Sequence, residues 1–192
     1  MSTIKELYDK FRETCDKSTE IFKGRVLRLV KDDITLPNGR KSVREVIRHK
    51  GAVCVVPVTD KGEVVIVKQY RYPFDEVLVE IPAGKLDTVD EIPLEAAKRE
   101  LHEETGAVAD SIKYLGAYYG SPAILDEKIY MYLAEGLHFG EQELDDDEFV
   151  ETERIPLEKL CTMIMNGEVP DGKTQAAVLR AAVMLGKMPT AD

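Results

Sequence analysis

The chain has 192 residues, the size of one ordinary domain with a small addition, and 44% of them are apolar, enough to build a buried core. The formal net charge is −10. This charge disfavours nucleic-acid binding, which is built on an excess of lysine and arginine. An acidic protein that handles anionic small molecules needs locally placed arginines or bound metal ions.

Cysteine usage and hydropathy indicate a cytoplasmic protein. The three cysteines, Cys15, Cys54 and Cys161, are odd in number and widely spaced, which argues against a disulfide framework or a zinc site. The longest apolar run, Ala52–Val58, is far too short to cross a bilayer. The N-terminus is charged throughout, so we expect no signal peptide and no membrane association.

The N-terminal quarter of the chain is predicted to form a separate segment. Helical spacing of apolar residues predicts an amphipathic helix over residues 3–16, and short β-type runs follow over residues 18–50, with a turn at Pro37-Asn38-Gly39. We therefore assign residues 1–50 to a helix and an antiparallel segment, and residues 51–192 to the main domain. Because an isolated hairpin is only marginally stable, we expect this segment to pack on a second copy of the chain.

The main domain is predicted to be a mixed α/β (α+β) sandwich. Its first two strands, Ala52–Val58 and Val64–Gln69, are expected to form a hairpin across a turn at residues 59–62. An acidic loop is expected over His138–Asp147. The remaining expected strands are Leu78–Ile81, Ile112–Tyr119, Ile129–Ala134 and Phe149–Ile155, and the expected helices are Leu94–Thr105, 156–166 and 172–187.

The helix Leu94–Thr105 carries an unusual group of carboxylates. The helix has a narrow apolar stripe, formed by Leu94, Ala97 and Leu101. One flank of this stripe carries three acidic residues, Glu100, Glu103 and Glu104. Ala96 lies on the same flank, and its small side chain leaves space beside them. One interpretation is a solvated, salt-bridged face, and Arg99, four residues before Glu103, fits it.

Glu100 and Glu104 do not fit that interpretation, because neither has a cation three or four residues away on its own helix. Each pair of like charges costs ~0.2–0.5 kcal/mol, and anions near a helix C-terminus are disfavoured by the macrodipole. A divalent cation explains the arrangement best. Oxygen-rich sites select hard ions such as Mg²⁺ or Mn²⁺, and Mg²⁺ is usually held together with substrate phosphates.

The segment from Arg99 to Ala107, RELHEETGA, resembles the second half of the Nudix hydrolase signature without a gap. Glu91, separated from Arg99 by seven residues, also matches. Six residues separate Gly84 from Glu91, whereas the signature has five. Either the loop carries one inserted residue or Asp90 takes the place of the first glutamate.

Other segments resemble the ADP-ribose pyrophosphatase branch of that family over about residues 20–185. They are His49–Val58, Val64–Pro73, Val79–Asp87, Tyr119–Pro122 and Asp171–Thr174. The resemblance implies a Nudix α/β/α sandwich with a mixed sheet and a homodimer that shares the N-terminal segment. It also implies Mg²⁺- or Mn²⁺-dependent cleavage of a nucleoside diphosphate compound, such as ADP-ribose to AMP and ribose 5-phosphate.

By this resemblance, the metal ligands are Glu100 and Glu104, then Glu103 and the backbone carbonyl of Ala83. Arg99 orients a carboxylate, with an ordinary surface ion pair as the alternative. The acidic loop Glu141–Glu148 supplies the general base, for which Glu148 is the candidate and Glu103 the substitute. A solvated run of charges is the alternative for that loop.

The resemblance also suggests residues that contact the substrate. Arg71 would contact a phosphate, Arg44 and Glu45 would reach the nucleotide across a dimer, and Glu80 would hold a hydroxyl or support the metal. Phe22 would stack on adenine, although a core phenylalanine is the competing interpretation. Pro122 lies where that branch typically has a proline.

Two other functions remain open. One is a nucleotide-sugar or dinucleotide hydrolase of different specificity, since phosphate contacts do not distinguish these substrates. The other is a catalytically silent domain that senses nucleotides. Such domains usually lose their metal carboxylates, whereas Glu100, Glu103 and Glu104 are all present here.

Overall fold

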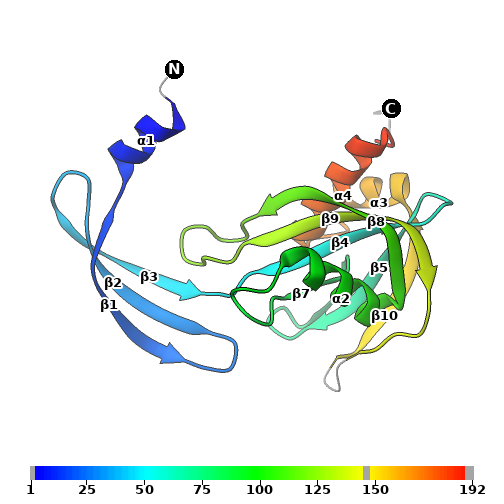
Figure 1. Ribbon diagram of the computed structural model, residues 1–192, viewed down its shortest axis with the longest axis horizontal. Helices are drawn as coiled ribbons and strands as arrows, with labels where there is room; N and C mark the ends of the chain where they lie inside the picture. Colours follow the sequence, from blue (N-terminus) through cyan, green and yellow to red (C-terminus); the bar gives the residue numbers. More distant parts are fainter. Residues whose placement is uncertain (1–2, 145–147, 189–192) are drawn as a thin grey trace. The chain divides into compact units, whose positions relative to one another are not determined.

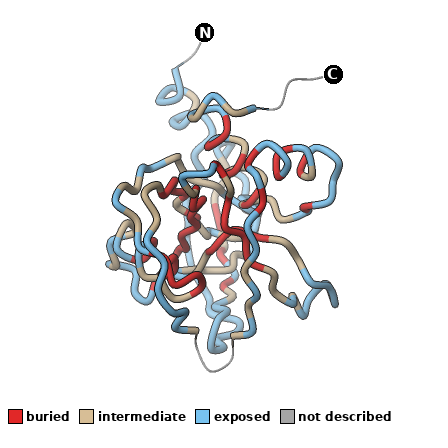
Figure 2. Tube along the Cα trace, turned by 90° about the vertical axis from the view of Figure 1, so that its right-hand side faces the viewer, coloured by how far each residue is buried: buried red, intermediate tan, exposed pale blue. Residues whose placement is uncertain are grey.

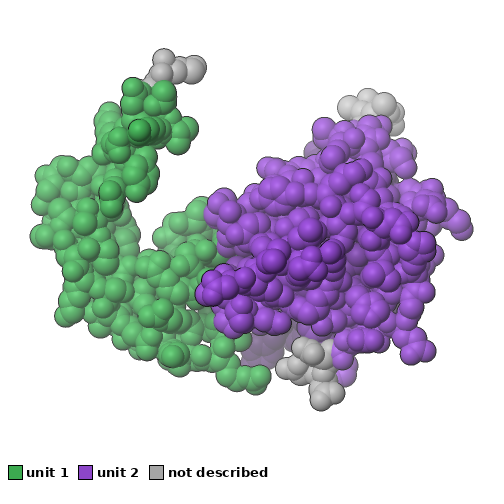
Figure 3. All heavy atoms as spheres, in the orientation of Figure 1, with its two compact units in different colours: residues 1–49, 121–127 green, residues 50–120, 128–192 purple. Residues whose placement is uncertain are grey.

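The computed structural model describes residues 3–144 and 148–188 (Figure 1). It divides into two compact units, shown in Figure 3. The first unit contains residues 1–49 together with the short segment 121–127. The second unit contains residues 50–120 and 128–192. Among the described residues, no helix is long and apolar enough to cross a membrane.

The first unit consists of a short helix and an antiparallel sheet. Its described elements are α1 (Ile4–Phe11), β1 (Thr14–Lys23), β2 (Arg28–Thr35) and β3 (Lys41–Arg48), with the strands in the order β1-β2-β3. The expected helix over residues 3–16 is too long. It ends at Phe11 because Thr14 and Cys15 extend to pair with Thr35 and Ile34 of β2. The expected turn is confirmed, with the N–H of Gly39 donating to the carbonyl of Leu36.

The segment 121–127 is held against β3 by backbone and side-chain bonds. The N–H of Ile47 donates to the carbonyl of Ile124, and the N–H of Asp126 donates to the carbonyl of Ile47. Arg48 then pairs with Asp126 at 3.2 Å and with the buried Asp32 of β2 at 2.8 Å. These bonds explain why a segment from the middle of the chain belongs to the N-terminal unit.

The second unit is built on a mixed sheet. Its strands, as described, are β4 (Ala52–Val58), β5 (Glu63–Arg71), β6 (Glu76–Glu80), β7 (Ala83–Lys85), β8 (Ala107–Tyr118), β9 (Ile129–Phe139) and β10 (Val150–Pro156). The order is β10-β5-β4-β9-β8, with β6 beside β5 and β7 beside β4. The β4–β9 pair is parallel and the other pairs are antiparallel, so the expected mixed sheet is confirmed.

Helices cover both faces of this sheet, which confirms the predicted α/β/α sandwich (Figure 1). The helices are α2 (Pro93–Thr105) on one face, and α3 (Leu157–Met165) and α4 (Gly172–Leu185) on the other. Alternate residues of β4 point to opposite faces. Val53 and Val55 pack with α2, whereas Cys54 and Val56 pack with α3 and α4. All four are buried, and Figure 2 shows this buried interior.

The expected hairpin of the first two strands opens immediately after its turn. β4 and β5 pair only at Val58 and Val64. Beyond that point β6 pairs with β5, and Glu80 lies opposite Val67. β7 pairs with β4, and Ala83 lies opposite Cys54. The segment 80–83 therefore crosses from one strand to the other, and this crossing positions the site described next.

β7 and β9 also differ from the sequence-based expectation. β7 was not expected, because a three-residue strand that contains glycine has the composition of a loop. β9 continues to Phe139, so the first residues of the expected acidic loop are strand. Both differences arise from pairing with neighbouring strands, which local composition does not reveal.

Candidate functional site

Helix α2 carries the candidate site and has the ends that its sequence predicts. Pro93 lies in its first turn, and Gly106 ends it in the left-handed conformation with φ 67°. Its buried face is wider than the expected apolar stripe. Ala96 is fully buried instead of leaving open space, and Leu94 is only partly buried. Glu100 and Glu104 belong to this buried face, not to a solvated flank.

The two buried glutamates lie against the backbone of β7. Glu104 is 3% exposed and accepts the N–H of Ala83 at 3.0 Å. Glu100 is 8% exposed and faces Gly84 so closely that a Cβ at residue 84 would overlap its carboxylate. Glycine at this position is therefore required by the close approach of a helix carboxylate to a strand. Glu103 is partly exposed and lies at the rim.

Burial raises the pKa of both glutamates, and nearby carboxylates add to the shift. Desolvation is the largest cause, and it raises the pKa of Glu100 to about 7 although Arg99 opposes it. Desolvation likewise raises the pKa of Glu104 to about 8 although the N–H of Ala83 opposes it. The negative charge of Glu148 adds to both shifts, so this acidic residue acts on the same place.

A divalent cation fits this pair of carboxylates. The raised pKa values of the two buried glutamates show that their surroundings favour added positive charge. The atoms that would bind a metal ion here are carboxylate oxygens, which hard cations prefer. The described residues contain no ready-made group of three His, Cys, Asp or Glu side chains arranged for a metal ion. In this structure the oxygens that such an ion would need are occupied by Arg99 and by the N–H of Ala83.

Arg99 lies among four carboxylates. It donates to Glu100 at 2.8 Å and to Glu103 at 3.0 Å, and it lies 3.4 Å from Glu91 and 3.8 Å from Asp87. Burial opposes the charge of Arg99, but the surrounding carboxylates raise its pKa overall. Arg99 is therefore more than an isolated surface pair, because it holds two of the predicted metal ligands at once.

The loop between Gly84 and Glu91 shows how the longer spacing is accommodated. Glu91 accepts the N–H of Asp87 at 2.5 Å and faces Arg99. Asp90 is exposed. The loop therefore carries the added residue, and Glu91 keeps the place of the first glutamate in the pattern.

A second charged group lies at the end of β6, beside this site. Both oxygens of the buried Glu80 accept hydrogen bonds from Arg71, at 2.6 Å and 2.7 Å, and one of them also pairs with Lys173. Lys173 also pairs with Asp171 at 3.0 Å. Sequence reasoning assigned no role to Lys173 or Asp171. The available signal was a lysine in the first turn of a helix, where the macrodipole disfavours positive charge.

The loop that leads toward Glu148 is anchored to the C-terminal end of α2. The N–H of Gly140 donates to the carbonyl of Gly106 at 2.7 Å, and the N–H of Glu143 donates to the carbonyl of Glu103 at 3.0 Å. The side-chain amide of Gln142 donates to the carbonyl of Glu104. Residues 145–147 of the predicted acidic loop lie outside the described residues. Glu148 itself is partly buried, just before β10.

The other predicted substrate residues lie in the first unit. Arg44 pairs with Glu13, and Glu45 is exposed on the same strand. Phe22 is 56% exposed, so its interpretation as a core residue is wrong. Pro122 is exposed in the segment 121–127. Within one chain, none of these four residues belongs to the same unit as Glu100 and Glu104.

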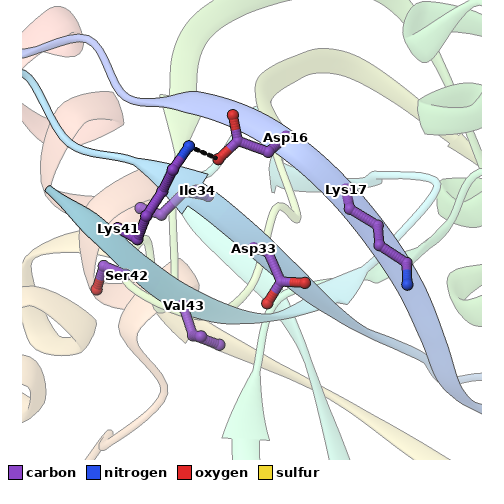
Figure 4. Close-up of a pocket in the computed structure, with 7 residues that line it drawn as sticks. All are labelled: Asp16, Lys17, Asp33, Ile34, Lys41, Ser42 and Val43. Atoms are coloured by element: carbon purple, nitrogen blue, oxygen red, sulfur yellow. Dashed lines mark hydrogen bonds and ion pairs between the residues drawn. The ribbon is translucent and has the colours of Figure 1, made fainter. Parts of the chain in front are cut away.

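A shallow cavity of about 520 Å³ is found on the three-stranded sheet of the first unit, and none of the predicted site residues lines it (Figure 4). It is lined by Asp16, Lys17, Asp33, Ile34, Lys41, Ser42 and Val43. Lys41 pairs with Asp16 at 3.0 Å, and Thr35 also donates to Asp16. Because these charges already neutralise one another, the cavity does not offer the unbalanced charge found beside α2.

Comparison with known proteins agrees with this geometry. Residues 48–178 match the model of the NUDIX domain. The chain belongs to the NUDIX family. It is 45% identical to the ADP-ribose pyrophosphatase of Bacillus subtilis (strain 168), with 83% of this chain and 86% of that protein covered. It is 42% identical to the methanol dehydrogenase activator of Bacillus methanolicus, with 88% and 91% covered.

A solved structure supports the fold independently of close sequence similarity. The crystal structure of an ADP compounds hydrolase superposes with a TM-score of 0.81 at 22% identity, over 92% of this chain and 97% of that one. Membership of the NUDIX family confirms the resemblance found in the segment from Arg99 to Ala107.

The raised pKa values predict a pH-dependent stability of the metal-free protein. In the unfolded chain both glutamates have a pKa near 4.5. Because both pKa values are higher in the folded protein, protonation stabilises the fold, and this stabilisation is complete below about pH 4.5. This stabilisation is lost as the pH rises through about 7 and then about 8. Urea unfolding in EDTA should show a free energy of unfolding that falls as the pH rises. The double variant Glu100→Gln/Glu104→Gln should lose less of this free energy than the unaltered protein between about pH 5 and 8. Identical slopes for the two proteins would contradict the assignment.

Proposed function

We propose that this NUDIX protein is a pyrophosphohydrolase that uses Mg²⁺ or Mn²⁺ to cleave ADP-ribose, or a related nucleoside diphosphate sugar. The products from ADP-ribose are AMP and ribose 5-phosphate. The observation that carries this proposal is the burial of Glu100 and Glu104 against the backbone at Ala83 and Gly84. The 45% identity to a protein named ADP-ribose pyrophosphatase supports the substrate.

Four groups are suited to hold the cation. They are the carboxylates of Glu100, Glu104 and Glu103, and the backbone carbonyl of Ala83. When bound, the cation would neutralise phosphate charge and lower the pKa of an attacking water. Arg99 keeps Glu100 and Glu103 on one side of α2 through bonds to both.

Side chains of this protein would take up the proton of the attacking water and contact the substrate phosphates. Water attacks one phosphorus, its proton passes to Glu148, and the bond from that phosphorus to the bridging oxygen breaks. The charge of Glu148 already reaches Glu100 and Glu104, which supports its choice as base. Arg71, the last residue of β5, would contact a phosphate of the substrate.

The alternatives have less support. A hydrolase for another nucleotide sugar or for a dinucleotide would use the same carboxylates and differ in how it recognises the rest of the substrate. A silent nucleotide-sensing domain would have no need for these buried glutamates, because their burial disfavours the charged carboxylates in the metal-free fold.

We also propose that the protein is a cytoplasmic homodimer whose first units are shared between subunits. All ten residues of β1 are exposed, and exposed apolar side chains in this unit include Ile21, Phe22, Val26 and Leu27. Such a surface needs a partner. A partner's first unit would bring Arg44, Glu45, Phe22 and Pro122 to the nucleotide. The three free cysteines fit a reducing compartment.

The activity is tested with ADP-ribose and Mg²⁺, and the products are resolved by chromatography. We expect AMP and ribose 5-phosphate, and no turnover in EDTA. Glu104→Gln should abolish turnover and leave the metal-free fold at least as stable, because the glutamine oxygen still accepts the N–H of Ala83 while the repulsion is relieved. A sharp loss of stability with full activity would show that Glu104 has only a structural role.

Glu148→Gln tests the general base. We expect kcat to fall by ~10²–10⁴-fold, the usual contribution of general acid–base catalysis, and KM to change little. Glu151→Gln on β10 is the matched control, because this exposed glutamate has no proposed role and should leave kcat unchanged. If kcat is insensitive to Glu148→Gln, the base is to be sought at Glu103.

Light scattering tests the dimer, for which we expect about twice the monomer mass. Replacing Ile21 and Phe22 together by serine should lower the dimer's stability, because both side chains are exposed in the single chain and would be covered in the dimer. A stable monomer at working concentration for the unaltered protein would refute the dimer without affecting the proposed chemistry.

A further inference from the structure

The segment Asp171–Thr174, which opens α4, has no part in the chemistry described above. In the structure it is tied to the end of β6. Asp171 caps the helix by accepting the N–H of Thr174 at 2.9 Å. The hydroxyl of Thr174, which is fully buried, accepts the N–H of Ile81 at 3.0 Å. The start of α4 is thereby fixed against the segment that crosses from β5 to β4.

Lys173 adds a charged contact at the same place. Its ammonium pairs with Asp171 at 3.0 Å and with Glu80, and only 12% of its side chain is exposed. The side chain of Glu80 is 2% exposed and also binds Arg71 through two parallel hydrogen bonds. Two cations and two carboxylates thus form one largely buried network with no net charge.

Stability alone does not explain this network. Burial alone would lower the pKa of Lys173, and only the attraction of Asp171 and Glu80 raises it overall. A positive charge in the first turn also opposes the helix macrodipole. Buried ion pairs are often no more stabilising than apolar residues of similar volume. What such a network fixes well is the orientation of its members.

The member whose orientation matters is Arg71. Its Nε and Nη2 atoms are bound to the two oxygens of Glu80, which fixes the plane of the guanidinium and leaves Nη1 outside the pair. The charges of Arg71 and Lys173 both reach Glu104. Glu80 also lies three residues before Ala83, whose N–H binds Glu104. The network therefore borders the buried carboxylates.

We propose that Lys173 is a positioning residue, which holds Glu80 and thereby aims the Nη1 edge of Arg71 at the pyrophosphate of the substrate. This inference rests on the proposed function, because it needs Arg71 to contact a phosphate. Without Lys173, the carboxylate of Glu80 keeps Arg71 but loses its own contact with α4, and the bond from the N–H of Ile81 to Thr174 is what still joins this segment to the helix. The Glu80–Arg71 pair is then free to turn as a unit, and phosphate binding weakens.

A double-mutant cycle tests this role, with Lys173→Met, Arg71→Ala and the two combined. Turnover of ADP-ribose and affinity for ADP, both with Mg²⁺, are measured for each protein. Lys173→Met should lower kcat/KM by about 10- to 100-fold, mostly through KM, as expected for a misplaced binding group. In the Arg71→Ala background the same change should have almost no further effect, because the group that it positions is gone.

Two further variants serve as a control and as a substitute for Lys173→Met. Lys68→Met removes another lysine–glutamate pair from β5, Lys68 with Glu153 at 2.6 Å, and should leave kcat and KM unchanged. Lys173→Gln keeps a hydrogen-bond donor to Glu80 and serves if Lys173→Met does not fold. It should show the same non-additivity with a smaller loss.

The outcomes separate this inference from the proposed function. Additive losses, or a loss confined to kcat, would overturn the positioning role while ADP-ribose hydrolysis by the unaltered protein stands. An unaltered protein that fails to hydrolyse ADP-ribose but shows the same non-additive cycle in ADP affinity would refute the hydrolysis and support the positioning role. Failure of both readouts to respond to Arg71→Ala would overturn the positioning role directly.

Discussion

The close approach of two helix carboxylates to a strand is the constraint on which the second unit depends. Glu100 and Glu104 face the sheet, where a helix normally places apolar side chains. This packing requires that residue 84 has no Cβ and that the N–H of Ala83 points at Glu104. Ala96 and Ala97, fully buried on the same helix, keep α2 near the sheet. This burial, with the nearby negative charges, raises the pKa of both carboxylates.

The open hairpin of β4 and β5 is what brings the required backbone to α2. If the two strands had stayed paired, no space would remain between them for the segment 80–83. Because they separate after Val58 and Val64, this segment carries Glu80 on the β5 side and Ala83 on the β4 side. One local separation of two strands therefore supplies both the anchor of Arg71 and the donor to Glu104.

Sequence reasoning found the helix, its ends and its two unusual glutamates, because these depend on residues close together in the chain. It missed the burial of Glu100 and Glu104, since spacing along a helix identifies neighbours on that helix and not on the facing strand. It extended the first helix through Cys15, which instead pairs with Ile34 nineteen residues away. The role of Lys173 was missed for the same reason, as its partner Glu80 is distant in sequence.

Gly106 illustrates how this packing restricts the sequences that are compatible with the site. Its left-handed conformation alone would admit asparagine, the usual substitute at the end of a helix. A Cβ there would also overlap the carbonyl of Gly140, in the loop anchored to α2. Two independent demands thus fall on one residue, and no single substitution meets both. Any replacement of Gly106 would therefore disturb the end of α2 and its contact with the loop at Gly140 together.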